Sequence, residues 1–146
     1  MNLPAGKNRE RVRMLVLAVL GVALYVQTIA FDYALDDGLV LTDNPIVLKG
    51  FAGLPELFSK DTFYGVFGEK TPRLLPGGRY RPFTPAMFAI EYALFGLKPM
   101  VGHLVNVALY AWLCMLVYQL LRRLLPGEPD ERWWRSIPFV AALLFA

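Results

Sequence analysis

Two adjacent carboxylates, Asp36 and Asp37, follow closely after a long apolar run in the sequence. A carboxylate can act as a general base on a hydroxyl group when it comes within hydrogen-bonding distance of it. Because the pair stands only about five residues beyond the apolar run, it could serve one lipid-borne and one water-borne reactant together. A solvated acidic loop that helps to orient the apolar segment would leave the same pattern. The two residues alone therefore do not specify an enzyme.

A second polar group contains Tyr80 and Arg81, with Arg73 and Arg79 nearby. Guanidinium groups present forked hydrogen-bond donors that suit a phosphate or a pyrophosphate. The same arginines could instead meet anionic lipid headgroups or pair with nearby acids. Both interpretations stay open from the residues alone.

A third group, His103, Asn106 and Tyr110, is spaced three and four residues apart and so shares one face of a helix. Polar side chains in an apolar helix normally face protein or a cavity. Hydrogen bonding between helices is the favoured explanation, and substrate contact by His103 and Asn106 is the alternative. Cys114 and Met115 are expected to be packing residues.

Composition excludes several classes of protein. Hydrophobic residues make up 56% of the 146 residues and charged residues 18%, which rules out intrinsic disorder. The net charge of +3 comes from basic residues beside apolar runs, so no nucleic-acid partner is expected. One cysteine permits neither an intrachain disulfide nor a cysteine-based zinc site. We predict no metal-binding residues and no certain cofactor, and the sequence leaves open whether a divalent metal takes part.

Two apolar runs are long enough to cross a membrane. Residues 14–31 would form a helix of about 27 Å, close to the roughly 30 Å hydrocarbon core of a bilayer. A cleaved signal peptide is the alternative for this run, since a basic segment precedes it. Residues 99–121 form a second uncharged run, and residues 137–146 form a third that is too short to span. The pattern predicts two full transmembrane helices and the start of a truncated third.

The charges beside these runs predict an orientation, because Lys and Arg favour the cytoplasmic side. Basic residues dominate residues 1–13, and Arg122 and Arg123 open the segment 122–136. The stretch that leaves the first run carries acids and no basic residue up to Leu48. We therefore expect residues 1–13 and 122–136 to be cytoplasmic and residues 32–98 to form an outer loop.

The outer loop is long for a plain connector, and long structured loops often carry function. Short interfacial helices are expected near residues 54–60 and 83–96. In the second, four residues at helical spacing form one apolar face suited to the membrane surface: Phe83, Met87, Ile90 and Leu94. The predicted fold class is an all-α integral membrane protein with a long outer loop.

Seven features occur in one order along the chain. The first apolar run is followed by Phe31-Asp32-Tyr33 with Asp36-Asp37, Asp43-Asn44-Pro45, Lys60-Asp61-Thr62-Phe63-Tyr64-Gly65, Tyr80-Arg81-Pro82-Phe83-Thr84, Tyr92-Ala93-Leu94-Phe95-Gly96-Leu97 and His103-Leu104-Val105-Asn106. In this order they resemble the N-terminal part of the transmembrane and tetratricopeptide-repeat O-mannosyltransferases and their bacterial relatives, within the GT-C superfamily. The resemblance covers roughly residues 24–125.

The resemblance implies an inverting membrane glycosyltransferase. Such an enzyme moves a sugar, mannose for example, from a polyisoprenyl-phosphate donor to a hydroxyl of a protein or glycan acceptor outside the cytoplasm. It implies that Asp36 is the catalytic base, with Asp37 as second candidate. It also implies that Arg81 and Tyr80 bind the donor phosphate, and that helix 83–96 packs against the outer loop.

The resemblance also bears on location and completeness. It implies a bacterial inner membrane or, in a eukaryote, the endoplasmic reticulum, with a cytoplasmic N-terminus. Because the family has further spans and a repeat domain, the chain is expected to be a fragment without activity of its own. The alternative is a non-catalytic polytopic membrane protein whose outer loop docks a partner; it predicts that Asp36→Asn is tolerated.

Overall fold

The computed structural model describes residues 5–70, 79–125, 132 and 134–146, and all regular elements in these ranges are helices. Arg73 lies outside the described residues. The chain divides into two compact units. Unit 1 comprises Met1–Thr28 and Leu104–Ala146, and unit 2 comprises Ile29–His103.

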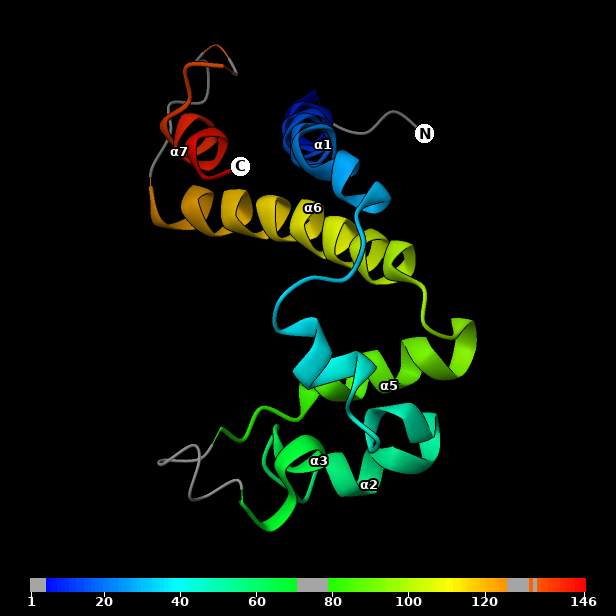
Figure 1. Cartoon of the computed structure of the whole chain (residues 1–146). Coiled ribbons are helices and arrows are strands. Elements are labelled where there is room, and N and C mark those ends of the chain that lie inside the picture. Colours follow the sequence, from blue (N-terminus) through cyan, green and yellow to red (C-terminus); the bar gives the residue numbers. More distant parts are fainter. Residues whose placement is uncertain (1–4, 71–78, 126–131, 133) are drawn as a thin grey trace. The chain divides into compact units, whose positions relative to one another are not determined.

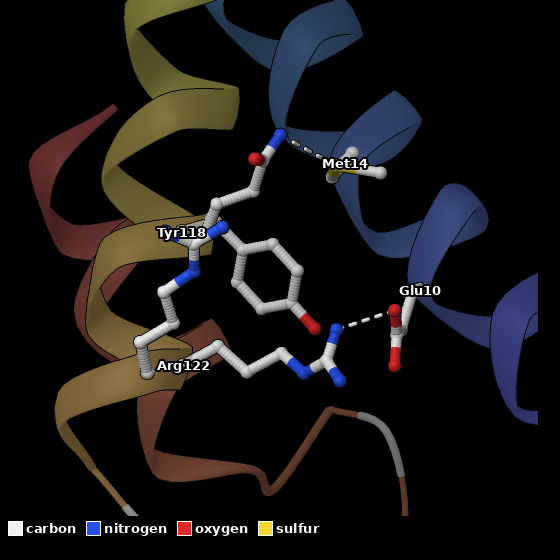
Figure 2. A pocket seen from close by; sticks show the side chains of 6 residues that line it. Glu10, Met14, Tyr118 and Arg122 are labelled. Carbon is white, nitrogen blue, oxygen red and sulfur yellow. Dashed lines mark hydrogen bonds and ion pairs between the residues drawn. The ribbon is translucent and has the colours of Figure 1, made fainter.

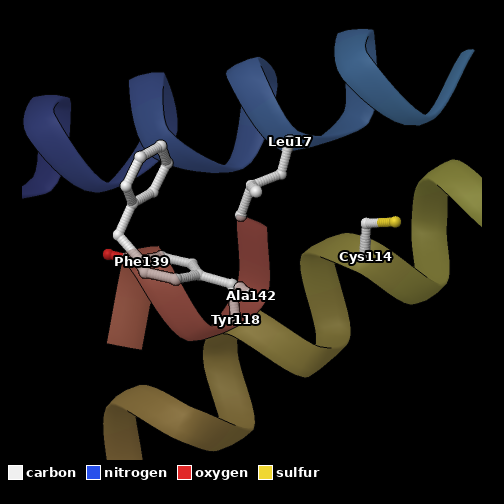
Figure 3. Packing of buried hydrophobic residues seen from close by; sticks show 5 residues of the cluster. All are labelled: Leu17, Cys114, Tyr118, Phe139 and Ala142. Carbon is white, nitrogen blue, oxygen red and sulfur yellow. The ribbon is translucent and has the colours of Figure 1, made fainter. Parts of the chain in front are cut away.

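Unit 1 consists of α1 (Ala5–Tyr25), most of α6 (Pro99–Leu124) and α7 (Ile137–Phe145). These helices meet in one apolar cluster, shown in Figure 3, which is formed by Leu17, Cys114, Tyr118, Phe139 and Ala142. The Cys114 thiol is fully buried in this cluster and is therefore a packing group, as expected from the sequence.

Two helical segments, Asn8–Ala30 and Pro99–Leu124, are long and apolar enough to cross a membrane. Only 11% and 22% of their most apolar windows are buried within the chain itself. Large apolar side chains therefore cover their outer surfaces, as expected for helices that contact lipid or further protein.

The two helices differ in extent from the uncharged runs that predicted them. Helix α1 begins before the first run and ends at Tyr25, where the 3₁₀-helix η1 (Val26–Ala30) continues the chain. Helix α6 runs on through Arg122 and Arg123 to Leu124. Charge-free runs underestimate helix length because Arg, Lys and Glu are good helix formers, and basic residues also suit the C-terminal end of the helix dipole.

Unit 2 is built from short helices gathered along α5 (Phe83–Phe95), as Figure 1 shows. The π-helix η2 (Gly38–Thr42), the 3₁₀-helix η3 (Val47–Gly53) and α2 (Leu54–Leu57) all contact α5. Helix α3 (Tyr64–Phe67) and the 3₁₀-helix η4 (Gly68–Lys70) follow. Their shared core is formed by Leu41, Ile46, Val47, Leu57 and Ala89.

Helix α5 packs on η3 through small residues. Ala86 and Ala89 are buried, and Gly50 of η3 has a positive φ of 60°. A Cβ added at Gly50 would lie 2.9 Å from the Cβ of Ala93, so glycine allows the close approach of the two helices.

Of the four residues predicted to form an apolar face on α5, three are exposed and Met87 is half-buried, whereas Phe88 packs against the core. Phe83, Ile90 and Leu94 are 79%, 38% and 60% exposed, respectively. These three side chains leave an exposed apolar face on α5, on which the Phe83 ring contacts Phe58. That this face lies in a membrane surface stays a prediction.

Glycine is also required where two segments of unit 2 meet the chain around Asn44. The buried Asn44 accepts hydrogen bonds from the backbone N–H groups of Ile46 (3.1 Å) and Val47 (3.4 Å) through Oδ1. A Cβ at Gly65 would overlap this oxygen, and a Cβ at Gly53 would overlap the carbonyl oxygen of Ile46. Both glycines therefore permit contacts that any side chain would block.

Candidate functional site

The acidic pair lies in a tight turn that leads from η1 into η2. The Asp37 carboxylate accepts a hydrogen bond from the Ala34 N–H (2.9 Å), and the Asp37 N–H donates to the Ala34 carbonyl oxygen (3.1 Å). Asp36 is exposed, and its carboxylate makes no hydrogen bond with any residue that the structure describes. Asp37 thus holds the turn, whereas the Asp36 carboxylate takes no part in its hydrogen bonds.

The residue before the pair, Leu35, has an unusual conformation. Its φ is 48°, in the left-handed region that disfavours residues with a side chain, and the residue is 98% exposed. Such a conformation costs about 1–2 kcal/mol. Strained backbone of this kind persists only where the surrounding fold holds it in place, and it often occurs beside functional groups. The turn therefore fixes the direction in which Asp36 leaves the backbone.

Three carboxylates of unit 2 act electrostatically on the hydroxyl of Tyr33. The pKa of Tyr33 is raised by burial and, in decreasing order, by the negative charges of Glu91, Asp37 and Asp32. The acidic turn and Glu91 of α5 therefore both affect the ionisation of Tyr33. Sequence reasoning assigned Glu91 no role, although a single acid within the apolar helix 83–96 was a signal that could have found it.

The Glu91 carboxylate is in an environment that disfavours its charge. Its Oε1 is buried and has no hydrogen-bond partner among the described residues. Burial raises the pKa of Glu91, because removal from water disfavours the charged form. Ionised Glu91 therefore destabilises the fold more than neutral Glu91 does.

We expect Glu91→Gln to stabilise the chain at neutral pH. A carboxyl group with a raised pKa in the folded state loses stability as pH rises through that pKa, and the neutral amide avoids this loss. The gain should stay below about 1 kcal/mol, since part of the side chain reaches solvent. Thermal unfolding at about pH 7 and about pH 4 tests this: the gain should shrink at the lower pH, where the wild-type carboxyl is neutral. An equal gain at both values would contradict the argument.

Tyr80 and Arg81 line an open hollow elsewhere in unit 2. The hollow has a volume of about 570 Å³ and is lined by Phe58, Tyr80, Arg81, Pro82, Phe83 and Thr84. Its wall is fixed, because the Tyr80 hydroxyl donates to the Phe58 carbonyl oxygen (2.7 Å) and the rings of Phe58 and Phe83 meet edge to face. The exposed Arg81 adds positive charge to an otherwise largely apolar surface.

Asp61 and Thr62 position the segment that carries Arg81. The Asp61 carboxylate accepts hydrogen bonds from the N–H groups of Arg79 and Phe63, and the Thr62 hydroxyl accepts one from the Arg81 N–H (3.1 Å). The Thr62 N–H donates to the Arg79 carbonyl oxygen (3.2 Å). Asp61 and Thr62 thus act on the Arg81 segment through hydrogen bonds to its backbone, which sequence reasoning did not anticipate.

The predicted site residues therefore fall into separate groups. Among the described residues, no side-chain hydrogen bond, ion pair or ring contact joins the turn at Asp36 and Asp37 to the hollow at Tyr80 and Arg81, although both belong to unit 2. His103 is half-buried on α6 and Asn106 is exposed. Neither side chain forms a hydrogen bond with a described group.

Tyr110 has a role in packing between helices. Its hydroxyl donates to the carbonyl oxygens of Phe145 (3.2 Å) and Ala146 (2.8 Å) of the α7 end. Its ring meets Tyr25 edge to face at 4.8 Å. Hydrogen bonding between helices, the favoured explanation for this polar stripe, is thus seen at Tyr110. In the part of the chain that the structure describes, no cluster of three or more His, Cys, Asp or Glu is arranged to hold a metal ion.

Comparisons with known proteins give relatives of one kind. The chain is 32% identical over 133 residues to protein O-mannosyl-transferase TMTC2 of Mus musculus and to its counterpart in Homo sapiens. These matches cover 90% of this chain and 14% of each relative. Protein O-mannosyl-transferase Tmtc1 of Drosophila melanogaster is 32% identical over 113 residues, which cover 76% of this chain and 12% of that protein.

No protein-family model matches the chain, and no solved structure matches it significantly. The chain spans about one-seventh of the length of the first relatives. Most of this chain is therefore homologous to a short part of proteins named as O-mannosyl-transferases of the TMTC type.

Proposed function

We propose that the chain forms part of a membrane glycosyltransferase of the GT-C type. The enzyme would transfer a sugar such as mannose from a polyisoprenyl-phosphate donor to a hydroxyl of a protein or glycan acceptor on the outer side of the membrane. The observation that carries the proposal is the similarity of 90% of the chain to proteins named as O-mannosyl-transferases. The two span-length helices are consistent with an enzyme whose donor is a lipid.

In the proposed reaction, Asp36 accepts the proton of the acceptor hydroxyl. The hydroxyl oxygen then bonds to the anomeric carbon from the face opposite the phosphate. The bond between this carbon and the phosphate oxygen breaks, its electron pair leaves with the polyisoprenyl phosphate, and the anomeric configuration inverts. The absence of a described hydrogen bond on the Asp36 carboxylate and the fixed turn before it support this role for Asp36 rather than Asp37.

Arg81 would stabilise the departing phosphate, and Tyr80 would shape the surface beside it. A positioned guanidinium group suits this task, because preorganised positive charge stabilises developing negative charge without reorganisation. The mixed character of the hollow supports the assignment, since an apolar wall beside a cation fits a phosphate attached to a hydrocarbon chain.

The test is transfer of radiolabelled mannose from polyisoprenyl-phosphate mannose in membranes that express the complete reading frame. Transfer by the wild type, lost in Asp36→Asn at matched protein levels, would support the proposal. No transfer with any polyisoprenyl-phosphate sugar would overturn it and favour the partner-docking alternative. Full transfer by Asp36→Asn would move the chemistry away from this turn.

Arg81→Gln should raise the KM for the lipid-linked donor about tenfold or more, because a hydrogen bond to a charged group contributes roughly 1.5–3 kcal/mol. Arg79→Gln is the matched control, since it removes the same charge two residues away. The Arg79 guanidinium lies 5.9 Å from the Phe63 ring centre and does not line the hollow. Donor titrations of both variants test the assignment. Equal KM changes in both would show that only net charge matters.

A further inference from the structure

A further hollow lies in unit 1, between the charged ends of α1 and α6. It has a volume of about 450 Å³, and its lining residues are shown in Figure 2: Glu10, Met14, Tyr118, Gln119, Arg122 and Arg123. The proposed sugar transfer uses none of these residues. The hollow is therefore a separate feature whose chemistry needs its own explanation.

Positive charge exceeds negative charge in this hollow. Arg122 forms an ion pair with Glu10. Arg13 donates through Nη1 to the Tyr118 hydroxyl (3.2 Å), and its Nε is buried without a partner among the described residues. Arg123 lines the hollow and forms no ion pair with any described residue. Three guanidinium groups thus share one carboxylate, an arrangement that an anion would complete.

The hollow lies where the apolar parts of both helices end. Met14 begins the uncharged run of α1, and Tyr118 and Gln119 stand in the last turn of the uncharged run of α6. Since both helices are long enough to span a bilayer, this level corresponds to the lipid headgroups. In the same unit, Trp134 is exposed with the Arg132 guanidinium 5.8 Å from its ring centre, a pairing typical of the membrane interface.

Both helices carry exposed apolar side chains on the membrane side of the hollow. Leu15 is 61% exposed on α1, and Leu116 and Leu120, which precede Arg122 and Arg123, are 41% and 55% exposed on α6. A ligand in the hollow would therefore meet cations at one end and a hydrocarbon surface at the other. This combination fits an amphipathic anion better than a free inorganic one.

We propose that this hollow binds the phosphate headgroup of an anionic membrane lipid, whose acyl chains lie along the exposed leucines. The guanidinium of Arg123 is the principal donor, because it is the lining cation without an ion-pair partner among the described residues. Arg13 contributes positive charge from below the surface. Basic pockets at the ends of transmembrane helices are suited to such headgroups. The inference is independent of the proposed sugar transfer.

The experiment uses the full chain in maltoside micelles that contain phosphatidylglycerol or phosphatidylcholine, with bound lipids counted by native mass spectrometry. We expect the wild type to retain phosphatidylglycerol in preference to phosphatidylcholine. Arg123→Gln should weaken phosphatidylglycerol binding about fivefold, the effect expected for one basic residue near a lipid surface. Arg123 is exposed, so the substitution should leave the fold intact, and helix content by circular dichroism checks this.

Arg11→Gln is the matched control, because Arg11 is an exposed arginine of α1 that does not line the hollow. Equal losses in the two variants would overturn the site in favour of diffuse charge attraction. Displacement of the lipid by millimolar inorganic phosphate would overturn the lipid assignment and identify a site for free phosphate. Equal retention of both lipids by the wild type would also refute the proposal.

Discussion

Sugar transfer by the complete protein is expected to fall about 10²–10⁴-fold when Asp36 is replaced by asparagine. The amide is close in size to the carboxylate but cannot accept the proton of the acceptor hydroxyl. Because the Asp36 side chain makes no hydrogen bond within the described chain, the substitution should leave the turn intact. The loss should appear in kcat, measured with saturating lipid-linked donor and acceptor.

Two further variants sharpen this test. Asp37→Asn should lose less activity, since its amide oxygen can still accept the Ala34 N–H that the Asp37 carboxylate holds now. Glu56→Gln is the control. Glu56 forms an exposed ion pair with Lys49 (2.6 Å), and the loss of such a pair changes stability little. A greater loss in Asp37→Asn than in Asp36→Asn would exchange the two roles.

The second large effect concerns stability: Gly53→Ala is expected to lower the free energy of unfolding of unit 2 by about 1–3 kcal/mol. The new methyl group would overlap the Ile46 carbonyl oxygen, so the backbone of the buried segment would have to move. Ile46 and its neighbour Val47 belong to the core of unit 2. Thermal unfolding of the full chain in detergent should show a midpoint at least about 4 °C lower.

Gly38→Ala provides the comparison for this experiment. A Cβ at Gly38 would meet only the Asp43 carboxylate, at an ordinary contact distance of 3.4 Å, and Gly38 lies in a helical segment. We expect little change in its unfolding midpoint. Equal midpoints for the Gly38 and Gly53 variants would mean that the backbone at Ile46 moves aside at little cost. This result would contradict the tight packing between Gly53 and Ile46.

The long helices could be predicted from the sequence because a charge-free apolar run is a one-dimensional signal. Their ends were less accurate, since Arg122 and Arg123 continue α6 where a count of charges would stop it. The helix at α5 was likewise evident from the spacing of its large apolar residues. Its packing face was not, because contacts through Ala89 and Gly50 depend on how closely two segments approach, which spacing does not encode.

The candidate site shows the same division. The chemical types at Asp36 and Arg81 were readable from the sequence, and so was their place after the first apolar run. The supporting contacts were not, because Asp61 and Thr62 act on backbone groups 17–19 residues away. The burial of Glu91 is also a tertiary property, since the sequence of α5 does not show which parts of the chain cover this side chain.

The small-residue packing of α5 has a consequence for the mutational tolerance of this helix. In most amphipathic helices, bulky apolar positions are the most sensitive to substitution, because they fill the core. On α5 the order should be reversed within the chain. A deep mutational scan would find Ala86 and Ala89 intolerant of almost every larger residue, whereas Phe83 and Leu94 would accept many apolar exchanges. Sequence variation along this helix would then be lowest at its small alanine residues rather than at its large apolar ones.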